Sequence, residues 1–237
     1  MEAKLRSISK QIHWSSALKA AIFALAWFWF PFWLFALVAL YLYFIPIFRS
    51  GKLAIPFFVL LALSYFQSSG ILFALVFGAI FYVMLLIKDL LVIERRSAYE
   101  LLVLILSFLA LRAFYITFDG GASGAALAWA FLIAAAIALL IHSFIRCFAE
   151  EVAVGIPVKK GAGWLTFLFV SQILIVGLFL PLDFVYQSVI VFLTVFLFID
   201  LLPEYLFGGL SPTKVLTAAT AVFALFTIVL ASAHWGL

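Results

Sequence analysis

Charged residues are scarce in this chain of 237 residues, where they make up only 10% of the sequence. Soluble domains contain roughly 25% charged and about 45–50% apolar residues, whereas 69% of this chain is hydrophobic. One core could not hide that much apolar surface from water, but a bilayer removes the need to hide it. The composition therefore excludes an ordinary soluble domain and indicates an integral membrane protein.

Cysteine and histidine are also rare, since the chain has one Cys and three His residues. The single Cys147 excludes an intrachain disulfide and a metal site built from cysteines. The sequence contains no HExxH, GxSxG or glycine-rich phosphate-binding motif. We therefore expect no metal and no cofactor, and the scattered basic residues give no reason to expect nucleic acid as a partner.

What the sequence does contain is a series of long apolar runs, which predict about nine transmembrane helices. An α-helix needs about 20 apolar residues to cross the hydrocarbon core, and its backbone groups must pair within the segment. The expected fold class is an all-α, polytopic transmembrane helical bundle, with one domain over 14–237 and 147–162 as its longest connection. The expected spans are 14–30, 31–48, 53–67, 71–87, 98–117, 124–146, 163–181, 184–201 and 213–233.

The run 14–48 decides the topology, because it is too long for one ordinary span and just long enough for two short ones. Pro31 favours two, since proline disfavours helix at the residue before it and is tolerated in a first helical turn. A helical hairpin broken at Pro31 also places thirteen of the fourteen Lys and Arg residues on one side, as the positive-inside rule favours. The alternative is one long, kinked and tilted helix.

The hairpin predicts a cytoplasmic N-terminus and an outer C-terminus, in a prokaryotic cytoplasmic (inner) membrane. Residues 1–13 are polar and basic, with apolar residues at helical spacing, which predicts a short amphipathic helix on the inner surface. A frayed basic tail is the alternative for this segment. Lys19 and Lys88 are expected at the inner interface.

Small residues recur every fourth position in the predicted sixth span. Such spacing lets helix backbones approach closely, which is how helices pack where lipid removes the hydrophobic drive between them. We therefore expect this helix near the centre of the bundle, although a four-residue row drifts slowly around a helix. The row consists of Ala122, Ala126, Ala130, Ala134 and Ala138, and His142 and Arg146 continue it at the same interval.

Ionisable and polar residues in or beside the spans are the candidate functional residues, because such groups are costly in lipid. Arg112 lies about 7.5 Å from the outer end of its span, where it could bind an anionic headgroup or snorkel toward Asp119. The row of His142, Arg146 and Glu150 could relay a proton, although capping of a helix end also explains it. The candidates are Arg112, Asp119, His142, Arg146, Gln172 and Asp200.

Neutral polar residues inside the spans are expected to be buried and to bond between helices. They are Ser171, Gln172, Gln187, Ser188, Thr217 and Thr220.

These observations favour a non-catalytic, multi-pass membrane component that binds membrane lipids or partner membrane proteins, or associates with itself. The 29 Phe and 7 Trp residues suit lipid-facing and partner-facing surfaces. A small permease is the alternative if Arg112, His142, Gln172 and Gln187 converge on one cavity. A lipid-active enzyme at the inner interface is a further alternative if His142 and Asp200 lie within reach of each other.

Overall fold

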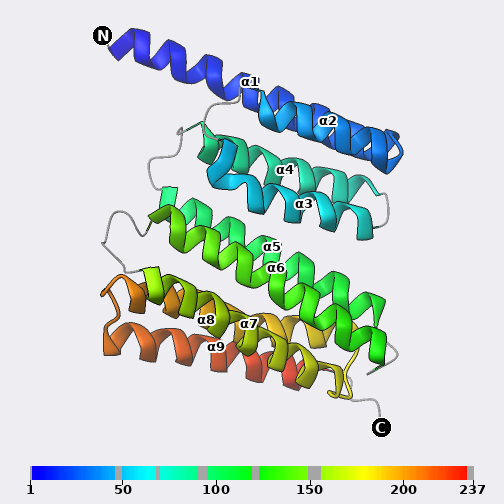
Figure 1. Ribbon diagram of the computed structural model, residues 1–237, viewed down its shortest axis with the longest axis vertical. Helices are drawn as coiled ribbons and strands as arrows, with labels where there is room; N and C mark the ends of the chain where they lie inside the picture. Colours follow the sequence, from blue (N-terminus) through cyan, green and yellow to red (C-terminus); the bar gives the residue numbers. More distant parts are fainter. Residues whose placement is uncertain are drawn as a thin grey trace. The chain divides into compact units, whose positions relative to one another are not determined.

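The computed structural model describes residues 2–45, 50–67, 70–89, 95–118, 123–148 and 156–233. Within these ranges the chain is all-α (Figure 1). Six helices, α4 to α9, are long and apolar enough to cross a membrane, so the expected class of membrane helical bundle is confirmed. The elements are α1 (Glu2–Trp29), α2 (Phe32–Phe44), η1 (Ser50–Leu53), α3 (Ala54–Phe66), α4 (Ile71–Lys88), α5 (Arg95–Thr117), α6 (Gly124–Phe148), α7 (Ile156–Leu178), α8 (Phe184–Leu206) and α9 (Pro212–Ser232).

The predicted connection 147–162 is wrong in its second half, because α7 already begins at Ile156. Pro157 is the second residue of the helix, where a missing N–H costs no internal hydrogen bond. Lys159 and Lys160 follow in helical backbone, for which lysine has a good propensity. The predicted end of the eighth span is also wrong, since α8 continues through Pro203 to Leu206.

The contacts of the chain divide it into two compact units, Met1–Leu102 and Val103–Leu237, and α5 crosses the boundary in sequence. In the first unit, helix α1 is continuous from Glu2 to Trp29. The helix then breaks at Phe30 and Pro31 before α2 begins, as expected from the proline. Helices α1 and α2 pack against each other. The crossing of the membrane by this pair stays a prediction, because α2 has only 13 residues.

Aromatic rings form the core of the first unit, a role that the expectation of lipid-facing aromatics did not include. Phe23 of α1 stacks on Phe81 of α4 with ring centroids 4.2 Å apart, and its other neighbour is Phe35 of α2 at 5.0 Å. Tyr43 of α2 stacks on Phe57 of α3, also at 4.2 Å. All five side chains are at most 1% exposed. Offset and edge-to-face pairs of this kind add about 0.5–1.5 kcal/mol each beyond their buried area.

In the second unit, α6 and α7 make the most extensive helix–helix contact. The small-residue row is buried as predicted, with Ala126, Ala130 and Ala134 at 0% exposure and Ala138 at 7%. Ala122 lies outside the described residues. The row then drifts outward, since Arg146 at its end is exposed. Helix α6 is thus packed by its small residues over about three turns, and the basic residue near its C-terminal end is exposed.

Helix α5 meets α7 at a close contact between Tyr115 and Gly177. The hydroxyl of Tyr115 donates a hydrogen bond of 3.0 Å to the carbonyl of Leu174. A Cβ on Gly177 would overlap the Tyr115 hydroxyl and lie 2.7 Å from Cγ2 of Val191. Only glycine therefore fits where α5, α7 and α8 meet.

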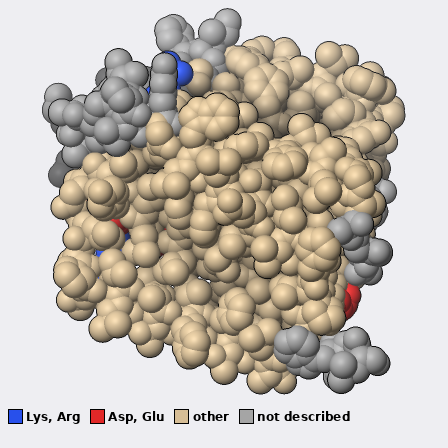
Figure 2. All heavy atoms as spheres, turned by 60° about the horizontal axis from the view of Figure 1, so that its bottom comes forward, with Lys and Arg blue, Asp and Glu red and all other residues tan. Residues whose placement is uncertain are grey.

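The last two helices are joined by a short turn with defined capping. Gly208 has a φ of 73°, and Gly209 N–H donates to the carbonyl of Glu204, which is the hydrogen-bond pattern of a Schellman motif. Ser211 accepts a hydrogen bond from the backbone N–H of Lys214 and caps α9. Lys214 also pairs with Glu204 at 3.3 Å. Along α9 itself only Val222 is buried. Figure 2 shows a molecular face on which Lys, Arg, Asp and Glu are confined to the margins.

Candidate functional site

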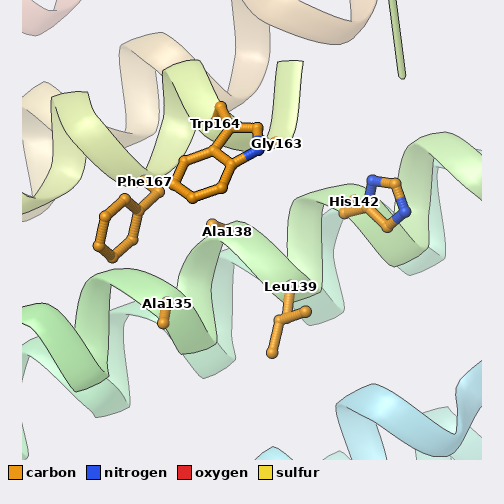
Figure 3. Close-up of a pocket in the computed structure, with 7 residues that line it drawn as sticks. All are labelled: Ala135, Ala138, Leu139, His142, Gly163, Trp164 and Phe167. Carbon is orange, nitrogen blue, oxygen red and sulfur yellow. The ribbon is translucent and has the colours of Figure 1, made fainter. Parts of the chain in front are cut away.

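A groove of about 470 Å³ lies between α6 and α7. Small side chains of α6 form its floor, and aromatic side chains of α7 stand over it, with His142 at one end (Figure 3). The lining residues are Ala135, Ala138, Leu139, His142, Gly163, Trp164 and Phe167. Histidine supplies the only titratable group of this lining. The groove is therefore an apolar channel with one polar end.

The aromatic side of the groove consists of two rings, and a third ring lies beyond the lining. Trp164 and Phe167 meet edge to face with centroids 5.9 Å apart, and Phe131 of α6 continues the row at 6.2 Å from Phe167. Trp164 is 68% exposed and Leu139 is 51% exposed, so the groove opens to the outside of the unit.

His142 reaches the groove because glycine stands opposite it. A Cβ on Gly163 would lie 3.6 Å from Nδ1 of His142, which is ordinary van der Waals distance. The imidazole is therefore held against the α7 backbone while remaining partly exposed. Of the six candidate residues, His142 is the one that lines this groove.

The remaining candidates lie in other places. Arg112 is partly buried on α5, Arg146 is exposed near the end of α6, and Asp200 is partly buried on α8. Asp119 lies outside the described residues, as do Glu150 and Glu151. The lining of the groove contains none of the partners that the permease and enzyme alternatives assign to His142, which are Arg112, Gln172, Gln187 and Asp200.

The expected burial of Gln172 is wrong, because its side chain is exposed on α7. Its neighbour Ser171 is buried and donates to the carbonyl of Leu168. Adjacent residues point about 100° apart around a helix, so Gln172 faces outward while Ser171 faces inward. Thr217 and Thr220 are likewise exposed, again contrary to expectation.

Gln187 and Ser188 are buried as predicted, but their hydrogen bonds stay local. Gln187 donates to the carbonyl of Leu180 at 2.8 Å, and Ser188 donates to the carbonyl of Phe184 one turn earlier. Among the described residues, Oε1 of Gln187 has no hydrogen-bond partner. These side chains satisfy backbone carbonyls near the start of α8 instead of linking helices across the bundle.

Sequence reasoning missed a second polar site, at the C-terminal end of α2. Lys88 is only 4% exposed, donates to the carbonyl of Tyr43 and lies 4.8 Å above the Tyr43 ring. Lys19 donates to the carbonyl of Ile45 at 2.6 Å. We call Lys19 and Lys88 the α2-end lysines. Two cations here complement the negative end of the helix dipole and bind carbonyls that have no partner within α2.

An acidic residue completes this site. Asp89 follows Lys88 and accepts a hydrogen bond of 3.4 Å from the hydroxyl of Ser16. Lys88 is thus buried against the end of helix α2, whereas its expected position at the inner membrane interface stays a prediction. The one available sequence signal was a lysine directly followed by an aspartate at the end of an apolar run, which is also common at ordinary membrane boundaries.

Within the described part of the chain, no three His, Cys, Asp or Glu side chains come together in a group that could hold a metal ion. The chain matches no protein-family model, no curated protein and no solved structure.

Proposed function

We propose that this protein is a non-catalytic membrane component that holds the hydrocarbon chain of a membrane lipid in the α6–α7 groove. The groove itself is the observation that supports this function. Its volume of about 470 Å³ falls in the usual range of small-molecule sites. Its lining is apolar except for His142, so it offers water almost no hydrogen-bonding partner and suits an apolar ligand.

The geometry also suits a chain better than a compact ligand. The floor runs from Ala135 to His142, which corresponds to about 10 Å along a helix axis. Its open side allows a chain to enter sideways from the bilayer, and Trp164 lies at the end nearest His142, where an indole suits the membrane interface. A lipid chain seated here would lie along α6 with its polar end toward His142.

Photo-crosslinking tests this function directly. The purified protein would be placed in nanodiscs containing a phosphatidylcholine with a diazirine within one acyl chain, and crosslinked peptides would be mapped by mass spectrometry. We expect enriched crosslinks on the groove residues of α6 and α7. Ala135→Phe should abolish this enrichment, because a ring there fills the groove floor. Ala128→Phe, at an exposed alanine of the same helix, is the matched control and should preserve it.

Two results would contradict the proposal. One is a uniform distribution of crosslinks over all exposed apolar residues, including those of α9. The other is an equal response to Ala135→Phe and Ala128→Phe.

We further propose that the N-terminus is cytoplasmic and that α1 and α2 cross the membrane as a hairpin in a prokaryotic cytoplasmic membrane. The break at Pro31 and the one-sided distribution of Lys and Arg support this topology. In a Cys147→Ser background, cysteine at Phe30, which is 48% exposed, should react with a membrane-impermeant thiol reagent from outside. Cysteine at Ser50 should react only after the membrane is opened. The reverse pattern would invert the topology.

A further inference from the structure

We propose that the first unit selects phospholipids with short acyl chains and thins the bilayer where α2 and α3 face lipid. This inference rests on the proposed hairpin topology of α1 and α2, and it does not depend on the α6–α7 groove. Helices α2 and α3 have 13 residues each, which corresponds to about 20 Å of helix. The hydrocarbon core of an ordinary bilayer is about 30 Å thick, so a helix of this length does not cross it.

The exposed face of α2 consists of apolar and aromatic side chains along its whole length. Trp33, Leu37, Tyr41 and Ile45 follow one another at every fourth position, and these side chains are 44–79% exposed. The length of helix from Trp33 to Ile45 is about 18 Å. Tryptophan and tyrosine prefer the two interfaces of a membrane, and here they lie near opposite ends of the face. This face therefore matches a hydrocarbon layer that is about 10 Å thinner than usual.

Charged groups at the C-terminal end of α2 fix one boundary of this layer. Lys19 is partly exposed, and its Nζ donates to the carbonyl of Ile45 at 2.6 Å. Because this ammonium group is held at the end of α2, it does not snorkel toward headgroups farther away. Asp89 is also partly exposed and follows Lys88, which donates to the carbonyl of Tyr43. Such charges are costly in hydrocarbon, so water or headgroups must reach this level.

Helix α1 gives a second measure of the same thickness. Trp14 and Trp29 are 77% and 72% exposed, and about 22 Å of helix separates them. Lys19 lies between them, about 15 Å from Trp29. Tilting does not make up the difference, because a tilted helix spans less of the bilayer and not more. By contrast, helices α6 to α9 of the second unit have 21 to 25 residues and are about 32–38 Å long.

Phospholipids with short acyl chains are the partners that fit this surface. A bilayer thins locally around a hydrophobic stretch that is too short for it, and shorter chains need less compression to do so. Such lipids should therefore concentrate beside α2 and α3. Helix α4 has 18 residues, about 27 Å, and so requires much less thinning. The selection is thus a local property of one side of the first unit.

Position-resolved photo-crosslinking tests the inference. The full-length protein is placed in nanodiscs that contain equal amounts of two diazirine phosphatidylcholines, one with short myristoleoyl chains and one with long erucoyl chains. Mass spectrometry gives the ratio of short-chain to long-chain crosslinks at each residue. We expect this ratio at Leu37 and Tyr41 to exceed the ratio at Leu225 and Ile228 of α9 by about threefold or more. The four side chains are all exposed, so α9 is a control within the same sample.

Exposed positions supply variants that leave the core intact. Trp29→Leu/Trp33→Leu removes the aromatic anchors at one end of the surface, and Lys19→Met removes a charge at the other end. Each variant should lower the α2 ratio toward that of α9. Phe223→Leu and Lys214→Met remove an exposed aromatic side chain and a partly exposed cation from α9. These matched controls should leave the α2 ratio unchanged.

The thiol-labelling assay at Phe30 separates this inference from the hairpin topology. If the cysteine at Phe30 reacts from outside but the α2 and α9 ratios are equal, the selection of short chains is overturned and the topology stands. If that cysteine reacts only after the membrane is opened, the hairpin does not cross and both proposals fail. If Trp29→Leu/Trp33→Leu changes the α2 ratio no more than Phe223→Leu does, the aromatic anchors do not set the thickness and the inference is overturned.

Discussion

The two units of this protein hold their helices together by different means. In the first unit, α2 and α3 have 13 residues each, about 20 Å of helix, and large aromatic rings fill the space between them and α1 and α4. In the second unit the helices α6 to α9 have 21 to 25 residues. There, alanines and a glycine allow close approach at α6 and α7.

The comparison shows two solutions to one physical problem. Between membrane helices there is little hydrophobic drive, so van der Waals packing and hydrogen bonds must provide the association. The first unit gains contact from ring stacking and binds its helix-end carbonyls with lysine and tryptophan side chains, such as Trp27 to Ser64 at 3.0 Å. The second unit also contains ring pairs, such as Phe169 and Phe198 at 4.5 Å, but between α6 and α7 it gains contact by bringing backbones together. Substitutions should therefore act differently in the two units.

The largest effect is expected at Gly177. Gly177→Ala places a methyl group onto the Tyr115 hydroxyl and against Val191, so α5 and α7 must separate and the hydrogen bond to Leu174 is lost. Overpacking of this kind costs about 1–3 kcal/mol of unfolding free energy. Because the added methyl group also meets Val191, we expect a cost at or above the upper end of that range. The measurement is thermal unfolding in detergent. Gly163→Ala is the control, because its nearest atom lies at 3.6 Å. Equal melting temperatures for both variants would show that the close contact does not hold the second unit.

Lys88→Met should have the next largest effect. It tests whether side chains that bind helix-end carbonyls stabilise the first unit. Methionine keeps the length of the side chain but cannot donate to the Tyr43 carbonyl, and it leaves Asp89 without its cationic neighbour. We expect destabilisation of about 2 kcal/mol, in the range for hydrogen bonds to charged groups. Lys19→Met should cost less, since Lys19 is partly exposed. A stabilised Lys88→Met variant would mean that desolvation of the lysine outweighs its bonds.

Gly78→Ala tests whether close backbone approach also contributes to the first unit. A Cβ at Gly78 would lie 2.9 Å from Cβ of Ala24, so α1 and α4 must move slightly apart. Alanine also favours the helix by about 0.5–1 kcal/mol, which offsets part of the cost. We expect a net loss of about 1 kcal/mol, smaller than at Gly177, measured by the same thermal unfolding. If Gly78→Ala lowers the stability as much as Gly177→Ala does, close backbone approach is equally important in both units, and the contrast between them does not hold.

Much of the fold could be predicted because membrane helices depend on local composition. The starts of α4, α6 and α8 coincide with the predicted ones at Ile71, Gly124 and Phe184. The buried alanine row of α6 followed from spacing alone. The start of α7 could not be predicted from hydropathy, because Lys159 and Lys160 are polar yet compatible with a helix. Hydropathy predicts where lipid can contact the chain, whereas helices continue beyond that point.

The candidate site was less predictable, because it depends on which residues face each other. His142 was recognisable as a polar residue in an apolar segment, but the groove exists because Gly163 and Phe167 of the next helix pair with it. The α2-end lysines depend on contacts between residues 26 and 45 positions apart. No local pattern encodes such a pairing. Gln172 shows the same limit, since its exposure depends on the rotation of α7 about its axis.

The smallest effect is expected at Arg112 of the second unit. It is partly buried on α5, about 7.5 Å from the C-terminal end of that helix, which the hairpin topology predicts to be the outer one. If it snorkels to the outer headgroups, a lysine of similar length reaches them equally well. We therefore expect Arg112→Lys to change unfolding stability by no more than about 0.5 kcal/mol.

The contrasting case for Arg112 is a planar fork that binds one phosphate or carboxylate by two hydrogen bonds, which lysine cannot reproduce. Measuring the melting temperature with and without added anionic lipid distinguishes the two. Under snorkelling, wild type and Arg112→Lys respond to the lipid alike, whereas a stabilisation that disappears in Arg112→Lys would establish a site for anionic lipid on α5. Arg112→Gln should then show how much stability depends on the positive charge itself. A lower melting temperature for Arg112→Gln but not for Arg112→Lys would confirm that this position requires a charge and not the geometry of a guanidinium.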